Sequence, residues 1–162
     1  MENKTITMLK EYGIPFIEYH HEPVLNYETA HKVDLELHLT GTEAKALYIR
    51  GKKTGNYYVF VTKEGVKLDA KYVKRLIGEQ ISIVSSDELT RLTGQEAGCV
   101  SPFGYDDKVI YIVDEAVYKE KGLLYAPGVA TMTFEISGEN LKKMIDKLPN
   151  KKYVYDSEHV EE

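Results

Sequence analysis

The 162-residue sequence contains a single cysteine, Cys99. One cysteine excludes an internal disulfide framework and a zinc site built from several cysteines, and it is typical of a reducing compartment. No apolar run is long enough to span a membrane, and the N-terminal stretch lacks the basic-then-apolar order of a signal peptide. We therefore expect a cytoplasmic protein that uses neither a metal nor an organic cofactor.

The chain also lacks internal repeats and low-complexity linkers. Its length is enough for one full hydrophobic core, and no shift in composition divides it into two units. We therefore expect residues 1–162 to form a single domain. The acidic end of the chain, residues 150–162, is expected to be a frayed tail, because chain termini are often poorly ordered.

Basic residues are in the minority, since 21 Lys and Arg stand against 26 Asp and Glu, but they are concentrated in one segment. Residues 50–75 carry eight basic and two acidic side chains, a net charge of +6, which leaves −11 for the rest of a chain whose total is −5. Such a basic face on an acidic body suits a partner with a phosphate backbone. An ordinary solvated helix and hairpin would explain the same charges equally well.

Apolar periodicity and turn residues predict helices and strands in an irregular order. We expect helices at 3–12, 26–33, 69–78, 85–94, 115–121 and 137–148. We expect strands at 14–21, 44–51, 56–63, 81–85, 108–114 and 130–136, of which the second and third form an antiparallel hairpin. This order predicts an α+β domain around a mixed, strongly curved, barrel-like sheet with surrounding helices.

One loop, GCVSPFG at 98–104, is built mostly from small residues. Gly98 and Gly104 permit positive φ angles and a close approach by another group, and Pro102 stiffens the chain between them. Such a loop can direct its own backbone N–H and C=O groups at a ligand. The alternative is a tight connection that only turns the chain.

Lys45 lies on the same face of its predicted strand as Leu47 and Ile49. A lysine at the edge of an apolar surface either extends to water or is held for a charged ligand such as a phosphate. Cys99 is a second candidate, as a nucleophile served by a histidine. None of the five histidines has the spacing of a metal site, and one sequence identifies no partner for the cysteine.

The order of these features resembles the YbaK/ProX family, the free-standing relatives of the editing domain inserted in bacterial prolyl-tRNA synthetases. The likeness runs from about Thr29 to Ile145. It rests on Lys45 at the head of a strand, the hairpin, the helix KLDAKYVKRLIG, the unit ISIVSSDELTRLTG and the loop EAGCVSPFG. Its most specific elements are Lys45 and the GxxxP pattern, which here runs from Gly98 to Pro102.

The resemblance implies an enzyme, an aminoacyl-tRNA deacylase that acts in trans on the ester of a mischarged tRNA, such as tRNA-Pro carrying a small wrong amino acid. The family's lysine, matched by Lys45, is implied to engage the terminal adenosine phosphate. The GxxxP loop is implied to present backbone groups to the ester, with water as the attacking group. It is matched here by Gly98, Cys99, Val100, Ser101 and Pro102.

The implied partner is the acceptor end of a mischarged tRNA, with an aminoacyl-tRNA synthetase as a further candidate. The basic residues expected to contact the tRNA through its phosphates are Lys52, Lys53, Lys63, Lys67, Lys71, Lys74 and Arg75. Two alternatives stay open at this point. One is a noncatalytic tRNA- or synthetase-binding module, and the other is a Cys99-dependent hydrolase of another small ester.

The sequence departs from the alanine-clearing relatives in two places. They resemble one another in an Asn after the lysine and in an HPLxN stretch, whereas here Ala46 follows Lys45 and YAPGVATMT stands at 125–133. The resemblance therefore does not imply specificity for alanine. The expected pocket wall consists of Tyr125, Gly128, Ala130 and Met132, with Thr29 opposite them.

Overall fold

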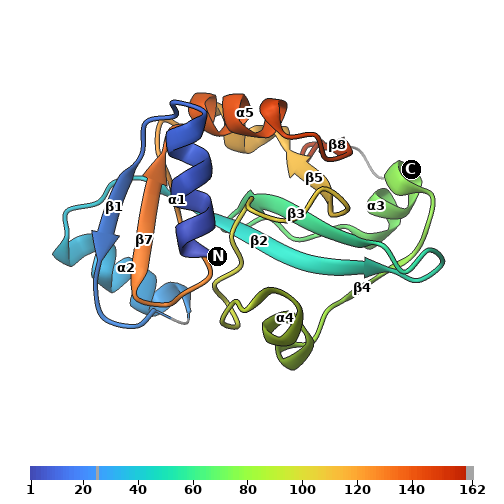
Figure 1. Cartoon of the computed structure of the whole chain (residues 1–162), viewed down its shortest axis with the longest axis horizontal. Coiled ribbons are helices and arrows are strands. Elements are labelled where there is room, and N and C mark those ends of the chain that lie inside the picture. Colours follow the sequence, from blue (N-terminus) through green and yellow to red (C-terminus); the bar gives the residue numbers. More distant parts are fainter. Residues whose placement is uncertain (25, 160–162) are drawn as a thin grey trace.

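The computed structural model describes residues 1–24 and 26–159, which form an eight-stranded sheet with helices around it (Figure 1). The helices are α1 (Glu2–Glu11), α2 (Tyr27–Glu36), α3 (Ala70–Ile77), α4 (Ser86–Thr93), the 3-10 helix η1 (Glu115–Lys119) and α5 (Gly138–Lys147). The strands are β1 (Ile17–His20), β2 (Thr42–Gly51), β3 (Tyr57–Lys63), β4 (Ile81–Ile83), β5 (Ile110–Asp114), β6 (Leu123–Tyr125), β7 (Met132–Ile136) and β8 (Lys152–Tyr155). No helix of the described residues is long and apolar enough to cross a membrane.

The sheet is mixed and curls without closing. Its strands follow the order β1-β7-β6-β2-β3-β5-β8, and β4 pairs with the far end of β2. The pairs β1/β7, β6/β7, β2/β3 and β2/β4 are antiparallel, whereas β2/β6, β3/β5 and β5/β8 are parallel. Because β1 and β8 stand at the two ends of this order, the sheet is open. The prediction of an α+β domain around a strongly curved mixed sheet is confirmed.

The β2–β3 hairpin separates two apolar clusters. Its antiparallel register runs from Ala44 opposite Lys63 to Arg50 opposite Tyr57, so alternate side chains of β2 lie on opposite faces. Leu47 and Ile49 belong to the smaller cluster, which is covered by α3. The intervening side chains of β2 contact the larger cluster, which is packed against α1 and α5. The alternation predicted from AKALYI is therefore confirmed.

The ends of the helices follow local sequence signals closely. Asn26, Asp69 and Ser85 cap α2, α3 and α4, because each side-chain oxygen accepts hydrogen bonds from backbone N–H groups of the first turn. Gly78 and Gly94 follow α3 and α4 with φ angles of 84° and 73°. These left-handed conformations favour glycine, which explains why the two helices end there.

Two strands of the structure are not predicted by the sequence. β6 has only three residues, so it is too short for a periodic pattern. β8 lies within the segment 150–162, and the expectation of a frayed tail is wrong for it. β8 pairs in parallel with β5, from Tyr111 opposite Lys152 to Asp114 opposite Tyr155. Tyr155 is buried against Phe60, with 4.8 Å between the ring centroids, and these long-range contacts anchor the segment.

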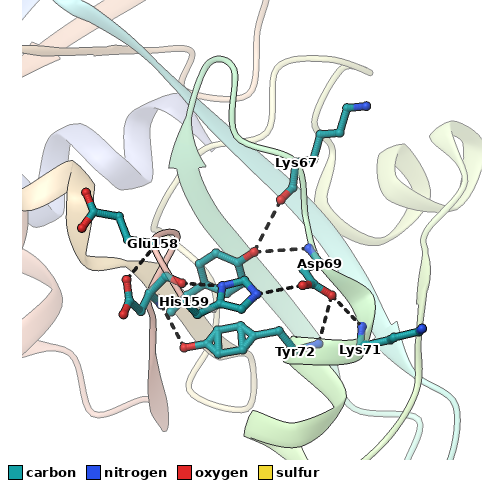
Figure 2. Close-up of polar contacts among 8 residues, drawn as sticks. Lys67, Asp69, Lys71, Tyr72, Glu158 and His159 are labelled. Carbon is teal, nitrogen blue, oxygen red and sulfur yellow. Dashed lines mark hydrogen bonds and ion pairs between the residues drawn. The ribbon is translucent and has the colours of Figure 1, made fainter. Parts of the chain in front are cut away.

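The segment after β8 docks on the start of α3 (Figure 2). His159 Nε2 lies 2.8 Å from Asp69 Oδ2, and His159 Nδ1 lies 2.7 Å from the Asp156 carbonyl oxygen. The imidazole stacks on Tyr72, with 3.8 Å between the ring centroids. Asp69 therefore has two roles, because Oδ1 caps α3 while Oδ2 accepts a hydrogen bond from His159.

The docking of residues 156–159 on α3 is expected to loosen as the pH rises. The hydrogen bond to Asp69 raises the pKa of His159 above its usual value of 6.5. The stabilisation is therefore fully present below about pH 6.5 and is lost as the pH rises through the higher pKa of the folded state. We expect the amides of residues 152–156 to exchange hydrogen more slowly below that pH than above it, after correction for intrinsic rates. The same pH dependence in His159→Gln would contradict this explanation.

Candidate active site

A cavity of about 370 Å³ lies between α2, the first half of β2, the loop at 98–102 and the segment from β6 to β7. This volume is within the range of roughly 300–1,000 Å³ that is typical of small-molecule sites. A gap in the sheet explains its position. β6 pairs only with Thr42 and Glu43 of β2, and β4 pairs only from Ile49 onward. Among the described strands, β3 alone therefore pairs with residues 44–47 of β2, which border the cavity.

Seven of the predicted site residues line this cavity. They are Lys45, Gly98, Val100, Pro102, Tyr125, Ala130 and Met132. Lys45 and the GxxxP loop, which lie far apart in the sequence, thus border the same space. Their chemical roles stay predictions at this point.

Four predicted site residues do not line the cavity: Thr29, Cys99, Ser101 and Gly128. Thr29 lies in the first turn of α2, where its N–H donates to the Asn26 side chain. Gly128 adopts a φ of 94°, and a Cβ added there would meet Met1 and the Gln95 side chain. Cys99 and Ser101 point into the protein interior, where both are almost fully buried. Val100 therefore lines the cavity, whereas its two neighbours Cys99 and Ser101 do not.

The Lys45 ammonium group has a carbonyl oxygen, and no carboxylate, as its partner among the described residues. Nζ donates to the backbone carbonyl of Val66 at 3.2 Å, in the connection between β3 and α3. The side chain is half-buried and borders the cavity. A cation that is partly removed from water and has only one neutral partner can accept an anionic ligand without breaking an internal ion pair.

An acidic pair, Glu43 of β2 and Asp34 of α2, also borders the cavity. Burial, followed by a hydrogen bond with Asp34 and the negative charge of Glu64, raises the pKa of Glu43 well above its usual range. The folded protein therefore disfavours the charged form of Glu43, and no ion pair between described residues joins Glu43 to Lys45, two residues further along the strand. Within residues 1–24 and 26–159, no three His, Cys, Asp or Glu side chains form a group that could hold a metal ion.

Buried side chains hold the backbone of the loop at 98–104 in place. Gly98 and Gly104 have φ angles of 78° and 108°, as expected for positions that require glycine. The Ser101 N–H donates to Gln95 Oε1 at 2.8 Å, and the Ser101 carbonyl accepts from the Tyr105 hydroxyl at 2.6 Å. Gly98 and Val100 are cavity-lining residues, and the described residues supply no acceptor for their N–H groups. The loop therefore has two backbone donors available for a ligand.

Cys99 has none of the features of an activated nucleophile. Its side chain is buried, and Sγ lies 3.8 Å from the Val24 carbonyl oxygen. Burial, and to a lesser degree the Glu96 carboxylate, raises the pKa of the thiol to about 11. The reactive thiolate is therefore scarce at neutral pH. This argues against the Cys99-dependent hydrolase.

His21 and Thr133 are cavity residues whose partnership the sequence does not predict. Nε2 of His21 lies 2.7 Å from Thr133 Oγ1, although the two residues are 112 positions apart. They meet because β1 and β7 pair in antiparallel fashion, with Tyr19 opposite Thr133. Only knowledge of that strand pairing, which no local pattern contains, would have revealed them.

Most of the residues predicted to bind tRNA are exposed. Six are exposed, in the β2–β3 turn, after β3 and on α3: Lys52, Lys53, Lys67, Lys71, Lys74 and Arg75. We call these six residues the basic face. The β2–β3 turn and α3 lie at the opposite end of the molecule from α2 (Figure 1). Lys67 follows Val66, whose carbonyl accepts from Lys45, so the basic face begins one residue from the partner of that lysine. Lys63 differs, because it is half-buried and donates to Glu120 at 3.0 Å.

Comparison with known protein families places this chain in a class of tRNA-editing proteins. The model of the aminoacyl-tRNA editing domain family matches residues 21–144, a range that includes every residue lining the cavity. The chain belongs to this family, and the resemblance noted from the sequence is confirmed.

The chain is also similar to individual proteins. It is 28% identical over 145 residues to the prolyl-tRNA editing protein ProX of Acetoanaerobium sticklandii. The alignment covers 86% of this chain and 87% of that protein. The crystal structure of a hypothetical protein superimposes with a TM-score of 0.79 at 19% identity, covering 94% of this chain and 97% of the other. The crystal structure of a proposed trans-editing enzyme for prolyl tRNA synthetase gives a TM-score of 0.71 at 22% identity. The superposition covers 96% of this chain and 94% of the other. The two structural likenesses show a shared fold.

Proposed function

We propose that this aminoacyl-tRNA editing protein hydrolyses, in trans, the ester of tRNA-Pro or a similar tRNA that carries a small wrong amino acid. The observation that supports this most directly is that Lys45, Gly98 and Val100 border one cavity. The name of the curated relative, a prolyl-tRNA editing protein, supports the choice of tRNA. We further propose that the chain works as one domain in the cytoplasm, where charged tRNA is used, and that it needs no metal.

The cavity offers complementary groups to the two ends of an aminoacyl-adenosine. The Lys45 ammonium is available to the phosphate of the terminal adenosine. The N–H groups of Gly98 and Val100 are available to the carbonyl oxygen of the ester, on which negative charge develops during attack by water. One such donor is typically worth about 10²–10³ in rate. Small apolar side chains, among them Ala30, Ala44 and Ala130, border the remaining space and suit a small aminoacyl group.

The proposal is tested by incubating the protein alone, with no synthetase present, with tRNA-Pro charged with alanine, serine, cysteine or proline. Release of the labelled amino acid is followed over time. We expect at least one small noncognate ester to be hydrolysed faster than in buffer, while the prolyl ester persists. Tight binding of the tRNA without hydrolysis of any ester would instead support a noncatalytic binding module.

The basic face is expected to govern tRNA binding. Replacing Lys71, Lys74 and Arg75 by Glu should weaken binding and flatten its dependence on salt. Each lost phosphate contact lowers the slope of log affinity against log salt concentration by up to about 0.9. Binding is measured by fluorescence anisotropy over a range of salt concentrations. The matched control reverses Lys142, Lys143 and Lys147, three exposed residues of α5, and changes the net charge equally. Equal losses in the two triple variants would show that net charge matters instead of this face.

A further inference from the structure

His21 and Thr133 form a hydrogen-bonded pair inside the cavity, where the end of β1 meets β7. His21 Nδ1 lies 2.6 Å from the Glu22 carbonyl oxygen, and Nε2 lies 2.7 Å from Thr133 Oγ1. A carbonyl oxygen can only accept a hydrogen bond, so Nδ1 carries a proton. In the neutral imidazole Nε2 is then an acceptor, and the Thr133 hydroxyl donates to it.

This arrangement fixes the direction of the Thr133 hydroxyl. Its hydrogen points at the imidazole, so the lone pairs of Oγ1 are left for a second partner. Both residues border the cavity, and their backbones are held by the sheet. The His21 N–H donates to the Thr131 carbonyl at 3.0 Å, and Thr133 lies opposite Tyr19. A hydroxyl, a base and a group that orients the base are the parts needed to activate a hydroxyl or a water.

The other titratable groups that line the cavity are less suited to accept a proton. Burial raises the pKa of both Tyr27 and Tyr125, so these hydroxyls stay protonated. Glu43 and Asp34 are hydrogen-bonded to each other, and burial raises the pKa of Glu43 well above its usual range. Lys45 is a cation and has no lone pair to offer. Cys99 lies outside the cavity lining, as described above. The His21–Thr133 pair is therefore the best-placed proton acceptor for a water beside the ester.

We infer that Thr133 and His21 form a proton relay for the water that attacks the ester. Thr133 contacts the water, and His21 acts through Thr133 as a positioning residue and proton acceptor. The inference rests on the proposed function, because it requires an aminoacyl ester in the cavity.

As the water oxygen bonds to the ester carbonyl carbon, one water proton moves to Thr133 Oγ1 and the original Thr133 proton moves to His21 Nε2. The carbonyl electron pair moves to oxygen, where the N–H groups of the loop stabilise it. When this tetrahedral species collapses, the bond to the ribose oxygen breaks, and the imidazolium returns its proton through Thr133 to that oxygen. The products are the free amino acid and the tRNA with its terminal hydroxyl restored.

The test uses single-turnover hydrolysis of the best ester by the whole protein. Thr133→Val removes the hydroxyl without changing the shape, and His21→Gln removes the base. Each should lower the maximal rate about 10²-fold or more, the usual range for general base catalysis. The affinity for the charged tRNA should stay nearly unchanged, and Thr133→Ser should restore most of the rate. The double variant should lose no more than either single variant, because the two residues act as one unit.

The matched control is His20→Gln. His20 precedes His21, is exposed, lies 3.3 Å from Glu18 and does not border the cavity. A wild-type rate in Thr133→Val or His21→Gln would overturn the relay, and so would an equal loss in His20→Gln or a loss in affinity alone. An acyl group found on Thr133 by mass spectrometry would overturn it in favour of a nucleophilic Thr133. If wild type hydrolyses no ester, the proposed function fails and the relay fails with it. Thermal melting of each variant, with Thr133→Ala as a second truncation, separates lost chemistry from lost folding.

Discussion

Lys45→Ala is expected to lower the single-turnover rate of deacylation by roughly 10- to 100-fold, because a hydrogen bond to a charged group contributes about 1.5–3 kcal/mol. The melting temperature should change little. Lys45 Nζ donates only to the Val66 carbonyl among the described residues, and no carboxylate of those residues pairs with it. The truncation therefore leaves no buried carboxylate without a partner, an event that would cost about 3–5 kcal/mol.

Two further variants sharpen this expectation. Lys45→Arg should restore part of the rate, because a planar guanidinium keeps the charge but not the compact shape of an ammonium. Lys142→Ala is the control, since Lys142 is an exposed residue of α5 that pairs with Asp146 at 2.7 Å. Rates and melting curves are measured for all four proteins. Normal hydrolysis by Lys45→Ala would contradict the proposed site, and a large fall in its melting temperature would favour a structural role for this lysine.

Gly98→Val is expected to abolish most of the activity, by about 10²-fold or more if the loop donors are displaced from the ester. Gly98 has a φ of 78° and borders the cavity. A β-branched side chain at that position strains the backbone and also occupies the space beside the ester. Single-turnover hydrolysis and thermal melting are measured together, so that the effect on chemistry is separated from the effect on folding.

The controls for Gly98→Val come from its own neighbourhood in the chain. Gly94→Val imposes similar strain, because Gly94 has a φ of 73°, but a Cβ there meets no atom within 4 Å and the residue lies outside the cavity lining. It should keep its activity. Cys99→Ser should also keep its activity, because it preserves the backbone donors and the thiol is buried. Equal losses in Gly98→Val and Cys99→Ser would point to cysteine chemistry or to misfolding.

Local signals predicted the elements whose ends are set by single residues. Asp69 and Gly78 delimit α3 as expected, because an N-cap oxygen and a left-handed glycine act within one turn of the helix. The alternation in AKALYI likewise predicted which side chains of β2 lie with Leu47 and Ile49. Lys45 and Gly98 were predicted as site residues from the resemblance, and the structure places both at one cavity.

Features that depend on long-range pairing were beyond a single sequence. β8 forms because Tyr155 is buried and its strand pairs with β5, and nothing local to residues 150–162 reveals that neighbour. His21 meets Thr133 only through the β1/β7 pairing. Ser101 belongs to the predicted loop but turns inward, because Gln95 and Tyr105 bind its backbone from inside the protein. Lys63 was assigned to the tRNA face, yet Glu120 engages it.

The central claim is that the editing reaction takes place in the cavity between α2, β2 and the loop at 98–102. It is tested most directly by titrating the isotopically labelled protein with a stable aminoacyl-adenosine analogue, in which an amide replaces the ester, and following backbone amide signals by NMR. The account predicts that saturable shifts concentrate at Lys45, Gly98, Val100 and Thr133. Shifts confined to α3 and the β2–β3 turn, with none around the cavity, would contradict it.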